Sequence, residues 1–472
     1  MKTSKIYKII EKMRLFSMYS WTRNRHLLNG YGQNFMSKPW AGGVVLLLCV
    51  AVAMFLANFP LTAEWYHNIL HMPLVVEVGD AHHGFSWIFP REMNVEKLIN
   101  DGLMVIFFFT VGLEIKREIV CGQLSSFRQA ILPVLAAAGG MLAPALIYTV
   151  INHGTGSISG WGIPTATDIA FAVGILSMLG DRVPVSLKVF LTALAIADDL
   201  GAIIVIALFY GGQIQWACLI VALLIMALLY CMNRMGETRM MFYLVPAIVV
   251  WALFYYSGVH STISGVAMAL LIPMKPRYSK EYFFHKSRLL AERLNDLAGR
   301  EEFPDEEHRY YLRRLGHVAN ASVGMSYRLE HFLTPYVTFL IMPIFALANA
   351  GVVISSSEYF NIFHFSPEFG SVGMGVFFGL LLGKPLGIFG ASWLAVKSKL
   401  AVMPSGASWP MLLAVACLGG IGFTMSIFVD TLAFSHPEMI DRGKIAILMG
   451  SFAAAILGSL LIVLFAKSQK KA

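Results

Sequence analysis

Charged residues are scarce in this chain, and that scarcity limits what kind of protein it can be. Of its 472 residues only 14% are charged, whereas 57% are hydrophobic. Soluble globular proteins carry about 25% charged residues. The composition therefore excludes an ordinary soluble domain. The formal net charge of +8 would suggest a nucleic-acid partner in a soluble protein, but here it is better explained by the basic loops that flank membrane spans.

Cysteine is also rare, and its five positions carry no metal or redox pattern. Four of the five lie inside apolar runs and no Cys-x-x-Cys pair occurs, so neither a metal centre nor a disulfide framework is expected, and no cofactor is expected either. No secretory signal is expected, because the first sustained apolar run begins only near Ala41. Residues 1–39 are interpreted as an uncleaved cytoplasmic tail.

Long hydrophobic runs are what the sequence has in abundance. They recur from Trp40 to Phe465, and many have about 20 residues, the helix length that crosses a hydrocarbon core of about 30 Å. Helices are expected because hydrocarbon offers no water to satisfy open backbone groups. Breaker residues divide the runs into predicted transmembrane helices, twelve in all. They cover residues 41–61, 97–115, 129–150, 163–180, 184–210, 213–233, 240–257, 259–273, 333–353, 372–395, 409–432 and 444–466.

The lysines and arginines predict which side of the membrane each loop faces. All but five of the 36 lie in the two tails or in alternate loops, which places both termini in the cytoplasm by the positive-inside rule. The chain thus divides into a tail at 1–39, a membrane transporter domain at 40–466 and a second cytoplasmic tail at 467–472. The five exceptions are Arg91, Lys97, Lys384, Arg442 and Lys444.

Two stretches of the membrane domain are expected to lie outside the bilayer. Residues 62–95 form an external loop in which 74–78 are rich in β-formers and are followed by Gly79–Asp80, a pattern that fits a hairpin. Residues 275–330 form a charged cytoplasmic insertion, where leucines at helical spacing predict a short amphipathic helix. These leucines are Leu290, Leu294 and Leu297.

Ionisable residues inside the predicted spans are few, and each is a candidate for function. A charge at mid-bilayer costs at least about 2.5–3.5 kcal/mol. The pair Asp198–Asp199 lies in the middle of the fifth span, Asp168 lies early in the fourth, and Lys384 lies within the tenth. His260 and Asp430 lie near outer boundaries, where a solvated or hydrogen-bonded structural role explains them equally well.

The pair Asp198–Asp199 predicts cation/proton exchange. Neighbouring residues on a helix point about 100° apart, so one carboxylate can face a cavity while the other faces a neighbouring helix. Carboxylate oxygens suit hard cations such as Na⁺. Adjacent like charges and burial both favour the protonated form of a carboxyl group. A proton and a cation can therefore compete for the pair.

Two predicted spans are interrupted by helix-breaking residues. Residues 162–168 (GIPTATD) interrupt the fourth span, and residues 419–424 (GGIGFT) interrupt the eleventh. Paired interrupted segments point to a transporter's binding site. The ends of half-helices carry partial charges, which Asp168 and Lys384 would compensate. Lys384 also suits a salt bridge to Asp198.

Seven motifs carry a resemblance to a known family. In chain order they are residues 111–118 (VGLEIKRE), 166–172 (ATDIAFA), 195–202 (AIADDLGA), 257–260 (SGVH), 345–351 (FALANAG), 383–387 (GKPLG) and 420–426 (GIGFTMS). On these motifs, spread over roughly residues 40–465, the sequence resembles the NhaA family of bacterial sodium/proton antiporters, which is itself one source of the rule on paired interrupted helices. It departs from the family pattern in the longer insertion at 275–330, at Tyr327, where the family can have a basic residue, and at Asp430, an added carboxylate.

The resemblance implies an all-α polytopic protein of the bacterial plasma (inner) membrane, with twelve transmembrane helices. It implies an inverted repeat whose broken fourth and eleventh helices cross at mid-membrane, and a homodimer formed through an outside hairpin near residues 74–95. The implied activity is electrogenic exchange of Na⁺ or Li⁺ for more than one H⁺. Asp199 would be the principal cation ligand, and Asp198 the second carboxylate, paired with Lys384. The residues expected at the helix crossing are Thr167 and Asp168.

Charges at one predicted cytoplasmic boundary suggest control by pH. Glu114, Arg117 and Glu118 lie where the second span meets the cytoplasm, and Glu330 lies just before the ninth span. Titration of such groups can bias a two-state element. The alternative is an ordinary cluster that anchors helix ends. His260 is a further candidate for the pH response.

Two other functions fit parts of the sequence. An ion-coupled symporter of an organic solute could use a similar inverted-repeat fold, but few polar residues exist beyond the cation set. Asp168 and Asp199 could form an intramembrane aspartyl protease dyad. The Gly-x-Gly-Asp motif usual in that chemistry does not occur, so no enzyme activity is expected.

Overall fold

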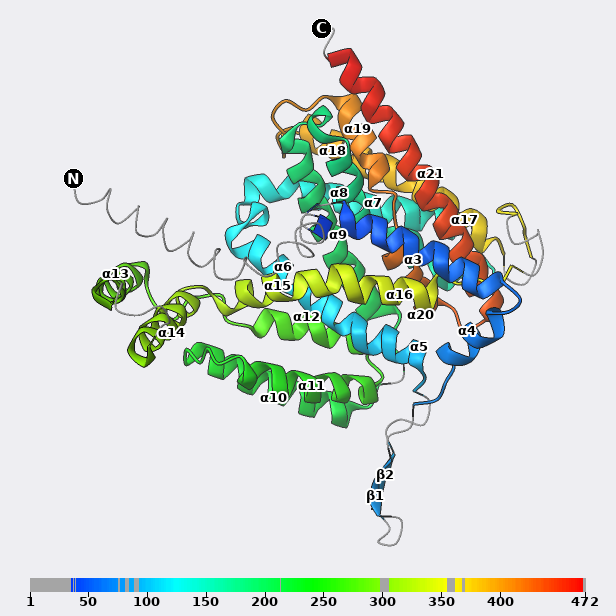
Figure 1. The fold of residues 1–472 in the computed structure, drawn as a ribbon. Coiled ribbons are helices and arrows are strands. Elements are labelled where there is room, and N and C mark those ends of the chain that lie inside the picture. Colours follow the sequence, from blue (N-terminus) through cyan, green and yellow to red (C-terminus); the bar gives the residue numbers. More distant parts are fainter. Residues whose placement is uncertain are drawn as a thin grey trace.

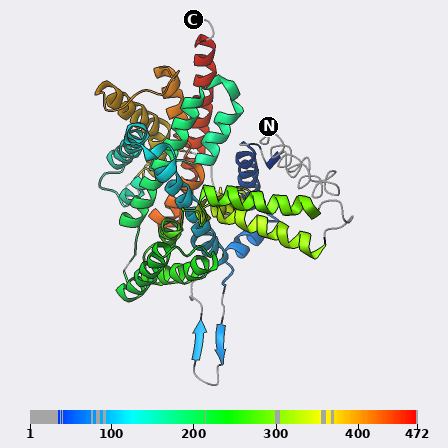
Figure 2. The ribbon, with the colours of Figure 1, turned by 90° about the vertical axis from the view of Figure 1, so that its left-hand side faces the viewer.

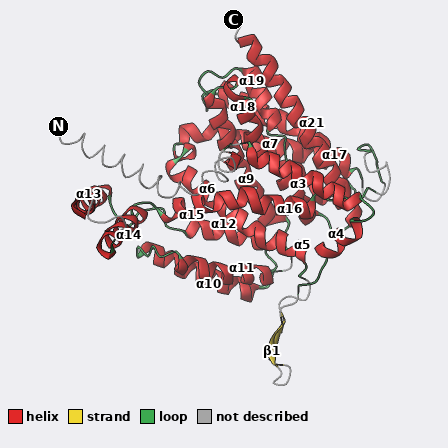
Figure 3. Ribbon diagram, in the orientation of Figure 1, coloured by secondary structure: helices red, strands yellow, loops and turns green. Residues whose placement is uncertain are grey.

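The computed structural model describes residues 35–36, 38, 40–74, 77–80, 85–88, 93–212, 214–297, 305–354, 361–366 and 370–469. Most of the predicted tail at 1–39, the end of the tail at 467–472 and parts of the external loop at 62–95 lie outside these residues. Within them the chain is almost entirely helical, as Figure 3 shows, which confirms the all-α fold class.

Nine helices of the described residues are long and apolar enough to cross a membrane, and a bent pair of helices makes a tenth candidate. The nine are α3 (Ala41–Asn58), Val95–Cys121, α7 (Phe127–Ile151), Ile158–Met178, α9 (Val185–Phe209), α10 (Trp216–Arg234), Met325–Asn349, Val372–Lys397 and α21 (Pro437–Gln469). The pair is α19 (Trp409–Leu418) and α20 (Phe423–Ala433), bent by 50°. Two shorter apolar helices are α11 (Met241–Ser257) and α12 (Ser261–Leu271).

Four of these spans are composite. Their parts are α5 (Val95–Lys97), η1 (Leu98–Leu103) and α6 (Met104–Cys121); η3 (Ile158–Thr165) and α8 (Ile169–Met178); α15 (Met325–Tyr336), η5 (Val337–Ile341) and α16 (Met342–Asn349); and α17 (Val372–Phe378), η7 (Gly379–Gly383) and α18 (Lys384–Lys397). Short connecting elements are α4 (Ala63–Leu70), η2 (Gln123–Ser125) and η4 (Gly180–Arg182). The segments η1, η5 and η7 are π-helical turns, a feature frequent at functional sites.

Each predicted range coincides with one apolar helix or helix pair, while the number of membrane crossings stays a prediction. Two predicted starts differ from the structure by seven residues or more. The ninth helix begins at Met325 rather than 333, and the last begins at Pro437 rather than 444. The predicted starts were wrong because charged residues were taken to end a span. Glu330 instead lies within helix α15, where Arg117 of α6 neutralises its charge at 3.1 Å.

The helices expose apolar side chains over their outer surface. Leu142 and Leu224 are both 64% exposed, and many other leucines, valines and phenylalanines are exposed in the same way. A soluble monomer rarely shows apolar patches of more than a few hundred Å², whereas lipid accepts such a surface. The chain is therefore a multi-pass membrane protein.

Helices α7 and α18 approach each other closely and fix the position of Lys384. A Cβ atom added to Gly139 of α7 would collide with the carbonyl of Gly387 in α18, and one added to Gly387 would collide with Gly139. Small residues allow helix backbones in membranes to pack this closely. Lys384 is the first residue of α18, directly after the π-helical turn η7, so it is held at this seam.

The charged insertion forms two helices that extend from the body on one side (Figures 1 and 2), α13 (Lys280–Leu297) and α14 (Glu306–Ala321). They pack on each other, and Leu290 and Leu294 are buried between them, as the leucine spacing predicts. The second helix was not predicted. Backbone bonds from Arg277 and Tyr278 to the carbonyl of Ala321 close the base of the pair.

The predicted external loop contains an antiparallel hairpin of β1 (Glu77–Asp80) and β2 (Phe85–Ile88). Gly79 pairs with Ser86, and Asp80 with Phe85, so the Gly79–Asp80 dipeptide belongs to the strand. The predicted hairpin is therefore present, but its turn does not lie at Gly79–Asp80. A glycine weakens a strand without excluding it, so the dipeptide alone could not locate the turn.

Candidate functional site

The first interruption lies between η3 and α8. Thr167 and Asp168 are buried there, and Asp168 has an extended backbone (φ −91°, ψ 101°) as the N-cap of α8. Its Oδ1 accepts a hydrogen bond from the backbone N–H of Phe171 at 3.2 Å. Aspartate is a favoured N-cap because it satisfies an open donor of the first turn. The sequence thus restarts the helix at Asp168.

The second interruption, between α19 and α20, contacts the first. The N–H of Asp168 donates to the carbonyl of Ile421 at 2.7 Å, and the hydroxyl of Thr167 donates to the carbonyl of Gly419 at 2.8 Å. Thr424 donates its backbone N–H (3.3 Å) and its hydroxyl (2.5 Å) to Oδ2 of Asp168. Each broken helix thereby satisfies polar backbone groups of the other, which hydrocarbon would leave open.

Asp168 therefore lies at the N-termini of two helices, α8 and α20. Helix N-termini carry partial positive charge, which a carboxylate stabilises. The sequence placed Asp168 at an interruption, but it missed Thr424 as its partner. The available signal was that Thr424 lies in the first turn of the helix after the second break, as Asp168 caps the helix after the first.

Lys384 and Asp198 form an ion pair beside the two interruptions. The Nζ atom of Lys384 lies 2.5 Å from Oδ2 of Asp198 and donates at 2.8 Å to the hydroxyl of Thr167. Lys384 is 0% exposed and Asp198 is 2% exposed. Burial of either charge alone is costly, so each compensates the other. The structure places this pair where the sequence suggested it, and its part in transport stays a prediction.

Asp199 has no such partner. Its side chain is 2% exposed, and its Oδ1 has no hydrogen-bond partner among the described residues. Buried carboxylate oxygens are normally satisfied, so an open one marks a place for an ion, a water or a proton. Its like-charged neighbours are Asp198, Glu114 and Asp168.

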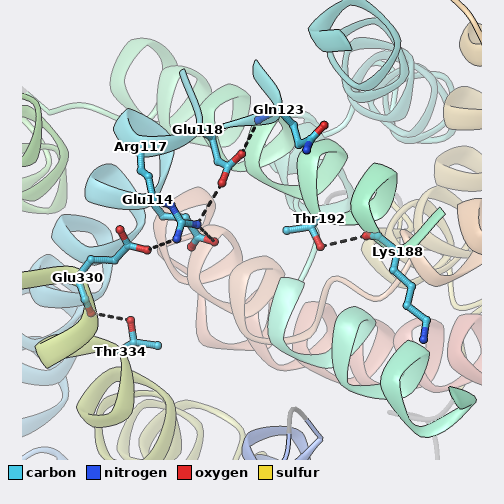
Figure 4. A network of polar contacts seen from close by, with 8 residues as sticks. All are labelled: Glu114, Arg117, Glu118, Gln123, Lys188, Thr192, Glu330 and Thr334. Carbon is cyan, nitrogen blue, oxygen red and sulfur yellow. Dashed lines mark hydrogen bonds and ion pairs between the residues drawn. The ribbon is translucent and has the colours of Figure 1, made fainter. Parts of the chain in front are cut away.

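The four charged residues predicted at the cytoplasmic boundary form one network (Figure 4). Arg117 of α6 contacts Glu330 of α15 at 3.1 Å, Glu118 at 3.1 Å and Glu114 at 3.9 Å. The second carboxylate oxygen of Glu118 accepts the backbone N–H of Gln123 at 2.9 Å. Arg117 thus joins two helices through three carboxylates.

His260 and Asp430 lie apart from this network. His260 is the N-cap residue of α12, and its Nε2 lies 2.5 Å from the carbonyl of Tyr210. The structure therefore does not group His260 with the other candidates for the pH response. Asp430 is 0% exposed, and neither carboxylate oxygen has a hydrogen-bond partner among the described residues. A solvated role for Asp430 is therefore wrong, because α20 buries it against α21.

Comparison with known proteins decides the family. The family model for Na⁺/H⁺ antiporter 1 matches residues 33–462. The antiporter NhaA of Wolinella succinogenes is 40% identical over 440 residues, covering 93% of this chain and 94% of that protein. NhaA of Helicobacter acinonychis is 42% identical over 438 residues (92% and 95% covered), and NhaA of Bacteroides thetaiotaomicron is 41% identical over 441 (91% and 96%). The chain belongs to the Na⁺/H⁺ antiporter 1 family.

Membership of this antiporter family confirms sodium/proton antiport as the activity and makes the chain a transporter rather than an enzyme. The symporter alternative is not favoured. Among the residues that the structure describes, no group of three or more His, Cys, Asp or Glu side chains is arranged to hold a metal ion. In an antiporter of this family Na⁺ is a transported substrate.

Proposed function

We propose that this antiporter exchanges Na⁺ or Li⁺ for more than one H⁺, with Asp199 as the principal cation ligand. The observation that carries the proposal is the buried Oδ1 of Asp199, which has no hydrogen-bond partner among the described residues. Oδ1 of Asp198 also has no partner among the described residues, but Oδ2 of Asp198 pairs with Lys384, and Asp168 is bonded to Thr424. Asp199 is thus the carboxylate in this group that is most open to a cation or a proton.

Asp198 acts as the second ligand by exchanging Lys384 for the cation. Without a cation, the ammonium of Lys384 compensates Oδ2 of Asp198. A cation bound at Asp199 places a second positive charge near that ammonium. Two neighbouring positive charges repel each other strongly where little water is present. Release of one proton from Asp199 and one from Lys384 removes this repulsion. Two protons leaving for one monovalent cation move net charge, which makes the exchange electrogenic.

Thr167 and Asp168 hold the two interrupted helices together at the site. Their partners are the carbonyls of Gly419 and Ile421 and the first turn of α20. These contacts are hydrogen bonds between broken ends, each worth about 0.5–1.5 kcal/mol, more for charged acceptors. We infer that the broken ends rearrange while the continuous helices keep their packing.

The proposed setting is the bacterial inner membrane with both termini in the cytoplasm, as the distribution of lysine and arginine supports. A homodimer through β1 and β2 is part of the proposal. This two-stranded hairpin extends from the helical body (Figure 1), and the edges of such a ribbon are a template for pairing with another chain.

Control by pH is assigned to the network around Arg117. It joins α6, which carries Glu114, to α15, which carries Glu330. Protonation of a carboxylate in this network changes how many negative charges Arg117 holds. Because Glu114 is also an electrostatic neighbour of Asp199, a change in the network reaches the cation site.

Everted vesicles that contain the full chain test the proposal. An imposed ΔpH should collapse on addition of Na⁺ or Li⁺ and persist on addition of K⁺. Asp199→Asn should abolish the response, while Asp296→Asn, an exposed aspartate of α13, is the matched control and should retain it. Near-normal exchange by Asp199→Asn overturns the ligand assignment. Flux that requires an organic solute would favour the symporter, and an exchange rate indifferent to an imposed membrane potential would refute electrogenicity.

A further inference from the structure

Asp430 is a buried carboxylate for which the central site provides no role. Its side chain is 0% exposed, and both of its carboxylate oxygens lack a hydrogen-bond partner among the described residues. Most buried side-chain polar atoms in proteins have at least one partner, and an exception indicates a functional group or an ion or water at the site. Two open oxygens on one fully buried residue therefore point to a ligand.

Asp430 lies on the helix that leads away from the central site. It follows Thr424, the partner of Asp168, by six residues, which is about 9 Å along α20 at 1.5 Å per residue. Helix α20 continues to Ala433, toward the end of the molecule opposite the α13–α14 pair (Figure 1). The lysine and arginine distribution predicts that this end faces outside. Asp430 thus lies between the central carboxylates and the outer end.

Helix α21 leaves room for this carboxylate. A Cβ atom added to Gly443 would fall on both oxygens of Asp430, so a residue without a side chain is needed there. Lys444, the next residue, is 7% exposed and acts electrostatically on Asp430, and no ion pair within 4 Å joins them. Asp441 is a further charged neighbour on α21.

The remaining titratable groups that face Asp430 are two tyrosines from α7 and α9, Tyr148 and Tyr210. Their hydroxyl groups already donate to other acceptors, Tyr148 to the carbonyl of Ser157 at 2.9 Å and Tyr210 to the carbonyl of Ser159 at 2.8 Å. Neither tyrosine therefore compensates the carboxylate.

We propose that Asp430 is a second binding site for the transported monovalent cation, on the route between the central site and the outer side. Carboxylate oxygens are preferred ligands of hard cations, and both oxygens of Asp430 are open. Lys444 competes with the cation for Asp430, in the way that Lys384 competes at Asp198. The proposal rests on the proposed function for the ion, Na⁺ or Li⁺, and for the place of the central site, while the residues of the second site are different.

Transport kinetics measured separately from the two faces test this site. The full chain is assayed in everted and in right-side-out vesicles, and KM for Na⁺ is determined in each. Asp430→Asn should raise KM on the outer face about tenfold, as expected when a charged ligand is lost, and leave KM on the inner face unchanged. The unchanged inner face also shows that the variant is folded. Asp296→Asn, at the exposed aspartate of α13, is the matched control and should alter neither face.

A second variant keeps the test decisive if Asp430→Asn fails to insert. Lys444→Gln removes the competing ammonium and should lower KM on the outer face alone. A KM that is unchanged on both faces, or changed equally on both, overturns the second site. Loss of exchange in Asp199→Asn together with an unaltered outer KM in Asp430→Asn would refute this inference and leave the central assignment intact.

Discussion

Replacing Lys384 by alanine removes one half of a fully buried ion pair. Its ammonium donates to Oδ2 of Asp198 and to the hydroxyl of Thr167, and no part of the lysine is exposed. The variant leaves the Asp198 carboxylate without its counter-charge in an interior closed to water. Removing one partner of a buried pair costs about 3–5 kcal/mol. Lys384→Arg keeps the charge and should retain part of both stability and exchange.

The expected change in Tm follows from the length of the chain. An unfolding entropy of about 2.1 cal/mol/K per residue gives about 1 kcal/mol/K for 472 residues. A loss of 3–5 kcal/mol therefore lowers Tm by about 3–5 °C. Lys397→Ala, at an exposed position of the same helix, is the matched control and should change Tm by about 1 °C or less, because it loses only an exposed contact with Trp393.

Thermal unfolding of the purified variants in one detergent measures this difference. Adding Asp198→Asn to Lys384→Ala removes the stranded charge, so the double variant should regain most of the lost Tm. That recovery distinguishes an electrostatic partner from a lysine that merely fills space. The reasoning is refuted if Lys384→Ala has the same Tm as the wild type, or if the two substitutions lower Tm additively.

Three further predictions concern other parts of the molecule. Thr424→Val removes the hydroxyl bond to Asp168 and should lower Tm by about 1–3 °C, whereas Thr424→Ser should not; equal Tm values for both would contradict the contact. Glu330→Gln removes one carboxylate from Arg117 and should shift the activity–pH profile, measured at saturating Na⁺, by about half a pH unit or more. Maximal exchange should stay within about twofold of the wild-type value. If the profiles of the variant and the wild type coincide, the network only anchors the helix ends. Replacing residues 281–315 by a short flexible linker should preserve exchange, because α13 and α14 pack on each other. If the deletion variant inserts and folds but loses exchange, the two helices take part in transport.

The spans and their interruptions were predictable because their causes are local. A run of apolar residues predicts a transmembrane helix, because a segment in lipid must satisfy its backbone hydrogen bonds internally. The clusters of proline, threonine and glycine at 162–168 and 419–424 predicted the interruptions, although Pro133, Pro144 and the pair Gly139–Gly140 are accommodated inside the continuous helix α7. The charges that remained inside the spans were few, so Asp168, Asp198, Asp199 and Lys384 could be singled out from the sequence alone.

Contacts between distant segments could not be predicted in the same way. The bond from Thr424 to Asp168 joins residues that are 256 positions apart. The start of α15 was missed because Glu330 is tolerated in that helix only through Arg117 of α6. The burial of Asp430 depends on Gly443 in the next helix. The sequence alone does not distinguish this glycine from the other glycines among the 41 in the chain. Each of these three errors arose where the partner of a polar group lay on another helix.

The two interrupted helices explain why so many polar groups can share one apolar interior. Asp168 is stabilised by two helix N-termini, and the carbonyl of Gly419 by the hydroxyl of Thr167, so these groups need no water. Lys384 forms a direct ion pair with Asp198, whereas Asp199 forms none with a basic side chain among the described residues. Under the proposed exchange, a cation bound here displaces one proton from Asp199 and a second from Lys384, and protonation of both groups in turn excludes the cation.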